Sequence, residues 1–202
     1  MACFLLYLYK QHNNMKIIKI FLASSNELKP EREQFEIEVS RKNNLWKDKN
    51  FFLELLIWED LSARMSATRS QDEYNQKIKE CDLFVLLAYS KVGMYTEEEF
   101  ETAFGAFQKT KKPFIFTYFK DIDTDKEDSL EAFKNKLKDL GHFYASYSTF
   151  DNLWNQFNKE LDRLLLTDFE QNNISSNKRG KTIIQNAEKI YNIDKIDTAN
   201  FN

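Results

Sequence analysis

The sequence predicts an α/β fold in which a doubly wound parallel sheet carries helices on both faces. Two observations predict it. Short apolar runs alternate along the chain with longer stretches whose apolar residues recur at helical spacing. The alternation repeats five times between residues 15 and 168, which is typical of parallel strands joined by helical crossovers. Five such strands favour the flavodoxin-like strand order 2-1-3-4-5.

The predicted strands are apolar runs bounded by polar or turn-forming residues. The third is apolar almost throughout, as expected of a strand that is buried on both faces of a sheet. The fifth is the weakest, because it is short and contains several polar residues. The five predicted strands are Lys16–Ala23, Phe51–Trp58, Asp82–Tyr89, Pro113–Phe119 and Phe143–Tyr147.

The predicted helices follow the strands and carry signals at their ends. Pro30 suits a first helical turn. Thr96 is the expected N-cap of the helix after the third strand, since three glutamates follow it and favour the helix dipole. Gly141 is the expected end of the fourth helix. The five predicted helices are Leu28–Asn43, Gln71–Glu80, Thr96–Thr110, Leu130–Leu140 and Phe150–Leu166.

Composition narrows the chemistry that such a domain could support. The net charge is −3, without the basic excess of a sequence-independent nucleic-acid binder. The two Cys and two His lack the spacing of zinc ligands, and so few cysteines indicate reduced thiols and a cytoplasmic protein. With four Gly, no glycine-rich phosphate loop is present. We therefore expect no metal site, and chemistry that depends on carboxylates, hydroxyls and aromatic rings.

The two ends of the chain differ from the domain at residues 15–168. Residues 1–14 form an N-terminal extension whose apolar run, residues 2–9, is too short to span a membrane. Residues 169–202 turn polar and then carry isoleucines and a tyrosine in partial alternation, over too short a length to bury a core. We interpret them as a tail that contacts a partner or a second copy, with a disordered tail as the alternative.

Functional residues are expected where the predicted strands end. In sheets of this order, ligands bind beyond the carboxyl ends of the strands, at the point where the strand order reverses. Ser24 and Ser25 follow the first strand, Trp58 closes the second, and Gly93 lies just after the third. The serines either bind a ligand or cap a turn, and Trp58 is expected in the core or the cleft wall rather than on a ligand.

The helix after the third strand supplies the candidate catalytic group. Glu97 and Glu98 are explained by the helix dipole. Glu99 directly precedes Phe100, which is expected to be buried, so we expect the Glu99 carboxylate at the edge of the cleft. A carboxylate beside aromatic residues can stabilise a developing sugar cation, or act as base or nucleophile at an anomeric carbon.

These segments resemble a TIR domain, and specifically the NAD-cleaving TIR-like domains of prokaryotic immune proteins. NAD-cleaving members carry a glutamate at this place, followed by an apolar and then a small residue, as Glu99, Phe100 and Ala103 do here. Tyr95 stands where many members have Trp, a departure that keeps an aromatic ring. The resemblance covers residues 15–168 and rests on Lys19-Ile-Phe-Leu-Ala-Ser-Ser, the loop after Trp58-Glu-Asp, Cys81-Asp-Leu-Phe-Val-Leu-Leu and Glu99-Phe-Glu-Thr-Ala.

The resemblance implies an NAD⁺ glycohydrolase that acts in antiviral defence. NAD⁺ is then the substrate, no separate cofactor is needed, and the products are nicotinamide and ADP-ribose or a cyclic isomer. Glu99 would offset the charge that develops on the ribose, and Tyr95 would stack near the nicotinamide. Arg64 and Arg69 would meet the pyrophosphate, with exposed loop arginines of no specific role as the alternative.

The resemblance also implies activation by self-association. The loop at residues 60–70 of one copy would complete the cleft of another, and a separate sensor or activator protein would supply the signal. Two other functions stay open. One is a non-catalytic TIR scaffold for protein assembly. The other is a nucleoside deoxyribosyltransferase-like enzyme, although that family usually carries a Gly- and Asp-rich loop before its glutamate, where this chain has Gly93 alone.

Overall fold

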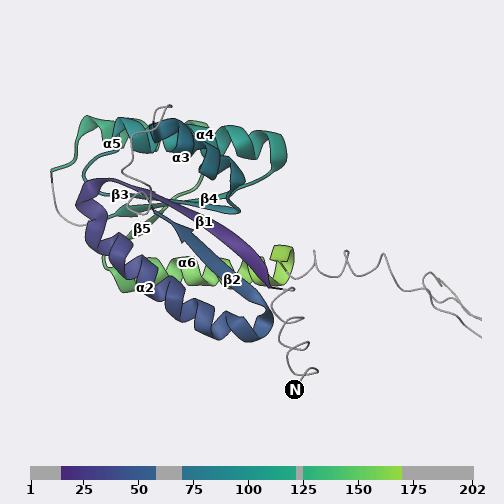
Figure 1. Cartoon of the computed structure of the whole chain (residues 1–202). Helices are drawn as coiled ribbons and strands as arrows, with labels where there is room; N and C mark the ends of the chain where they lie inside the picture. The colour runs from purple at the N-terminus through teal and green to yellow at the C-terminus, as the bar shows by residue number, and fades with distance from the viewer. Residues whose placement is uncertain (1–14, 58–69, 122–124, 170–202) are drawn as a thin grey trace, which may run out of the picture. The chain divides into compact units, whose positions relative to one another are not determined.

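The computed structural model describes residues 15–57, 70–121 and 125–169, and the structural statements below concern these residues (Figure 1). Within them, a five-stranded sheet has the order β2-β1-β3-β4-β5, and every adjacent pair is parallel. The predicted fold class and strand order are confirmed. The strands are β1 Lys16–Ser24, β2 Phe51–Leu56, β3 Leu83–Ala88, β4 Phe114–Lys120 and β5 Ala145–Tyr147.

Helices lie on both faces of this sheet. Figure 1 shows α3, α4 and α5 on one face and α2 on the other. On the α2 face, the ring of Phe35 lies 5.4 Å from that of Trp154 and 5.1 Å from that of Phe157, both in α6. The helices are α2 Lys29–Trp46, α3 Ser70–Glu80, α4 Met94–Thr110, α5 Asp128–Asp139 and α6 Phe150–Leu164, with 3-10 turns η1 Asn26–Leu28 and η2 Lys47–Lys49 and a π-helical turn η4 Leu165–Phe169.

Strand β3 lies at the centre of the sheet and of the core. All six of its residues are buried, as the apolar run predicts. The rings of Phe21 on β1 and Phe84 on β3 stack 5.9 Å apart, and Phe100 of α4 and Phe133 of α5 meet edge to face at 5.1 Å. The first contact joins β1 to β3, and the second joins α4 to α5.

The start of α4 differs from the prediction. The N-cap is Gly93, in an extended conformation, and the helix begins at Met94. The backbone N–H of Glu97 donates to the Gly93 carbonyl over 3.0 Å, which places Thr96 inside the first turn, where it is buried. Gly and Thr are about equally favoured as N-caps, so the earlier start at Gly93 costs little. Glu97 alone of the three glutamates lies in the first turn.

None of the described helices is both long enough and apolar enough to cross a membrane. Within the same residues, no group of three or more acidic, His or Cys side chains is arranged to hold a metal ion.

His142 is a half-buried histidine that makes stability depend on pH. Its Nε2 lies 3.1 Å from Thr117 Oγ1, and its ring lies 6.2 Å from the ring of Phe100. Burial lowers the pKa of His142 from its usual value of 6.5. As pH falls through 6.5 toward the lower folded-state pKa, the unfolded chain takes up the proton first, so the folded state loses stability.

We therefore expect the free energy of unfolding to decrease as the pH is lowered through this window. Urea denaturation at a series of pH values measures it. In His142→Gln, which cannot titrate, the decrease should be smaller. An identical pH dependence in the two proteins would contradict the assignment of this effect to His142.

Candidate functional site

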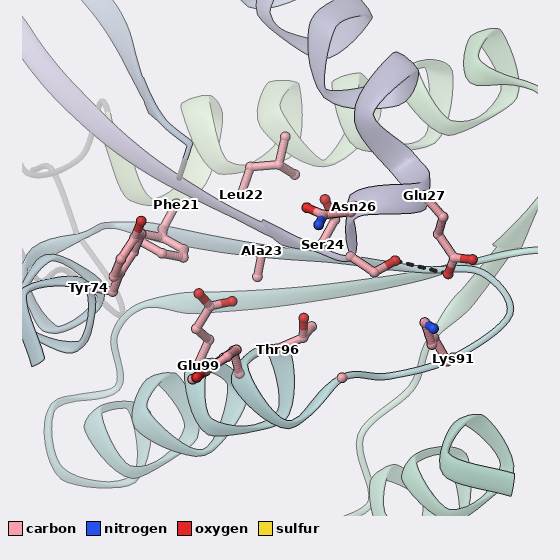
Figure 2. Close-up of a pocket in the computed structure, with 13 residues that line it drawn as sticks. Phe21, Leu22, Ala23, Ser24, Asn26, Glu27, Tyr74, Lys91, Thr96 and Glu99 are labelled. Atoms are coloured by element: carbon pink, nitrogen blue, oxygen red, sulfur yellow. Dashed lines mark hydrogen bonds between the residues drawn. The ribbon is translucent and has the colours of Figure 1, made fainter. Parts of the chain in front are cut away.

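A pocket of about 740 Å³ opens at the carboxyl end of β1, between that strand and the start of α4 (Figure 2). Residues at the end of β1 and residues that follow β3 line it, and the strand order reverses at these two strands, which is the expected place for a ligand. Its size is that of a small-molecule site. The lining residues are Phe21, Leu22, Ala23, Ser24, Ser25, Asn26, Glu27, Tyr74, Lys91, Gly93, Tyr95, Thr96 and Glu99.

The pocket brings together five of the eight site residues that the sequence predicts. These are Ser24, Ser25, Gly93, Tyr95 and Glu99, which come from segments separated by more than 60 positions in the chain. The other three, Trp58, Arg64 and Arg69, lie outside the described residues.

Glu99 is the most enclosed charged group of the pocket. Only 9% of the residue is exposed, and Figure 2 shows its carboxylate pointing from α4 toward Ala23 on β1. The next residue, Phe100, is fully buried and anchors this turn of the helix. A carboxylate is costly to remove from water, so a buried one needs compensating interactions.

The two glutamates before Glu99 have partners outside the pocket. Glu97 Oε1 accepts a hydrogen bond from Lys136 Nζ of α5 over 2.7 Å. Glu98 Oε1 accepts one from Asn75 Nδ2 of α3 over 2.9 Å. Three consecutive carboxylates are thus separated by the helical turn, so that two join α4 to its neighbours and one lines the pocket.

Glu27 joins the two loops that form the rim. The Ser25 hydroxyl donates to Glu27 Oε1 over 2.9 Å, the bond drawn in Figure 2. From the loop after β3, the Ser90 backbone N–H donates to Glu27 Oε1 over 3.1 Å, and the Ser90 hydroxyl donates to Oε2 over 2.5 Å. One carboxylate therefore holds the loop after β1 against the loop after β3.

Aromatic and cationic side chains complete the mouth of the pocket. Tyr95 lies in the first turn of α4 with 58% of the residue exposed, so its ring is available to stack on a flat ligand. Lys91 forms an ion pair with Glu127 at 3.3 Å. Tyr74 reaches the pocket from α3. The arrangement combines an enclosed carboxylate with aromatic walls, which suits a ligand with a flat ring and a centre of developing positive charge.

Glu27 and Tyr74 are two of the lining residues that sequence reasoning did not predict. Glu27 lies in the 3-10 turn η1, and its link to Ser90 spans 63 positions, which no local pattern encodes. Tyr74 lies on α3, and the direction in which it points depends on how that helix packs.

A family model described as a domain of unknown function, DUF4062, matches residues 19–164. The chain belongs to the DUF4062 family. The DUF4062 match runs from β1 to the end of α6 and includes all eight site residues predicted from the sequence. This family description names no activity, and the finer TIR-like assignment is taken up as a proposal below.

No curated protein matches this chain. Two solved structures resemble it at 12% identity. Homoserine dehydrogenase of S. aureus gives a TM-score of 0.36, with 65% of this chain and 33% of that chain covered, so this chain spans about a third of it. RosB with a bound intermediate, 8-demethyl-8-formylriboflavin-5'-phosphate, gives a TM-score of 0.35, with 92% and 96% covered. At such TM-scores, neither likeness bears on the function of this DUF4062 protein.

Proposed function

We propose that this protein cleaves the bond between nicotinamide and ribose in NAD⁺, as an effector in antiviral defence. The observation that carries the proposal is the enclosed Glu99 carboxylate in a pocket at the reversal of strand order, with the Tyr95 ring one turn earlier at its mouth. The resemblance to NAD-cleaving TIR-like domains assigns the same two positions to the reaction.

The proposed chemistry needs one negative charge in a fixed place. When the bond from ribose C1′ to the nicotinamide nitrogen breaks, the electron pair leaves with nicotinamide, which becomes neutral, and the ribose becomes an oxocarbenium-like cation. The Glu99 carboxylate would offset that charge, and enclosure strengthens its effect because less water screens it. Attack by water at C1′ then gives ADP-ribose and releases a proton, whereas attack by an adenine nitrogen of the same molecule gives a cyclic isomer.

The remaining roles follow from the same proposal. Tyr95 would stack on the nicotinamide ring at the pocket mouth. Arg64 and Arg69 would bind the pyrophosphate, and the loop at residues 60–70 would complete the cleft of a second copy. A separate activator would then act by promoting self-association, with residues 169–202 as the contact segment. A TIR scaffold without catalysis would need neither an enclosed carboxylate nor an aromatic ring beside it.

The direct test is release of nicotinamide from NAD⁺ by the full chain over a range of protein concentrations. Free nicotinamide and ADP-ribose can be separated from NAD⁺ by chromatography. We expect the rate per mole of protein to rise with concentration, because association would complete the site. No release at any concentration, including under molecular crowding, would contradict the proposal and favour the scaffold function.

A further inference from the structure

Arg32 is a fully buried cation that does not line the pocket. It lies near the start of α2 with 1% of the residue exposed, and its Nη1 reaches the end of β1. There it donates to the Ser24 hydroxyl over 2.7 Å and to the Ser25 carbonyl over 2.8 Å. Burial of a guanidinium is unfavourable unless its donors find acceptors, so these two hydrogen bonds offset part of the cost of burying Arg32.

The turn that carries Arg32 is itself anchored. Glu31, the preceding residue, is also buried, and its carboxylate forms an ion pair with Lys120 Nζ at the end of β4 at 2.5 Å. Lys120 is only partly exposed and its Nζ lies 5.0 Å from the ring centroid of Tyr89. In the first turn of α2, Glu31 therefore joins the helix to the sheet, while Arg32 reaches Ser24 in the pocket wall.

The chemistry of these partners sets the direction of each hydrogen bond. A guanidinium has only donors, so the Ser24 oxygen must accept from Arg32 and keeps its own proton to donate. Among the described residues, that hydroxyl donates to no protein acceptor. A carboxylate only accepts hydrogen bonds, so the Ser25 hydroxyl is the donor in its hydrogen bond to Glu27. The two neighbouring serines thus differ: the Ser24 hydroxyl accepts a hydrogen bond within the protein, and the Ser25 hydroxyl donates one.

We propose that Ser24 is the serine that donates a hydrogen bond to an acceptor oxygen of the ligand, and that the buried Arg32 is the positioning residue that sets this polarity. Ser24 lines the pocket, and the positive charge of Arg32 polarises its O–H toward stronger donation. The inference rests on the proposed function for its ligand, since NAD⁺ carries acceptor oxygens on its ribose, diphosphate and carboxamide groups. It does not depend on whether the bound NAD⁺ is cleaved.

The test compares Ser24→Ala with Ser25→Ala in the full chain. NAD⁺ binding is measured by calorimetry in a Glu99→Gln background, which keeps the ligand intact. We expect Ser24→Ala to raise the Kd by about tenfold, the range for one lost hydrogen bond, and Ser25→Ala to raise it clearly less. Ser40→Ala, on the exposed face of α2, is the matched control and should leave the Kd unchanged.

The positioning role of Arg32 is tested by a double-mutant cycle with Arg32→Lys. Lysine keeps the charge but loses the forked geometry, so Arg32→Lys alone should also weaken binding. In the Ser24→Ala background, Arg32→Lys should raise the Kd little further, because Arg32 acts on the ligand by way of Ser24. If Arg32 has a purely structural role, Arg32→Lys should instead raise the Kd and lower the melting temperature by the same amounts whether or not Ser24 is present. Arg41→Lys, at an exposed position of α2, is the control for the substitution itself.

Several outcomes separate this inference from the proposed function. Binding without nicotinamide release by the wild-type chain overturns the proposed function and leaves this inference standing. Release by the wild type together with equal Kd values in the Ser24 and Ser25 variants overturns this inference alone. Failure of the wild type to bind NAD⁺ overturns both. If Arg32→Lys does not fold, the comparison of the two serine variants still decides the role of Ser24.

Discussion

Replacement of Glu99 by Gln should lower the rate of nicotinamide release by about 10²–10³-fold or more. Glutamine keeps the size of the side chain and its ability to form hydrogen bonds, but it removes the negative charge. If Glu99 offsets the ribose cation, that charge is needed mainly in the transition state. The loss should therefore fall on kcat, with a smaller change in KM.

Glu98→Gln is the matched control for this prediction. It changes the neighbouring position of the same helix, where the carboxylate bonds to Asn75 instead of lining the pocket. We expect Glu98→Gln to keep a rate within a few fold of the wild type. Circular dichroism and thermal unfolding establish that both variants are folded. Equal rates of nicotinamide release in Glu99→Gln and the wild type would contradict a catalytic role for Glu99.

The fold could be predicted because its main signal is strong and local. A strand buried on both faces must be apolar at nearly every position, and β3 is apolar from Leu83 to Ala88. Parallel pairing then requires a crossover between strands, and helices occupy these intervals. The strand order follows from few alternatives, so alternation of the elements was enough to predict it.

Element ends depend on smaller differences in free energy and were predicted less well. Thr and Gly are about equally favoured as N-caps, so residue preference does not separate Thr96 from Gly93, and α4 begins at Met94. The predicted strand from Phe143 is reduced to Ala145–Tyr147, because Phe143 lies at the surface. Tertiary packing decides such boundaries, and a local sequence pattern does not reveal that packing.

Some residues of the site could likewise be predicted from the sequence, and others could not. Ser24, Gly93 and Glu99 could be predicted because the topology places whatever follows β1 and β3 at one edge of the sheet. Arg32 could not, since in sequence it is one charged residue in a helix rich in Glu, Arg and Lys. Its role depends on a side chain that is buried and directed to Ser24, which only the packed structure reveals.

Replacement of Phe100 by Ala should lower the free energy of unfolding by about 3–5 kcal/mol. Phe100 is fully buried, and its ring lies 5.1 Å from that of Phe133 and 6.0 Å from that of Phe104. Alanine removes the apolar contacts of the ring and leaves a cavity that the neighbours only partly fill. Domains of this size are stable by about 5–15 kcal/mol, so the loss is a large share of the total.

Phe143→Ala is the same chemical change at a position that is 94% exposed. It should alter the free energy of unfolding by no more than about 0.5 kcal/mol, since surface substitutions away from special features have small effects. Urea denaturation of both variants measures the difference, and similar values would contradict the packing described for α4. Because Phe100 directly follows Glu99, the cavity should also loosen the turn that holds the carboxylate. Folded Phe100→Ala should then release nicotinamide more slowly than folded Phe143→Ala.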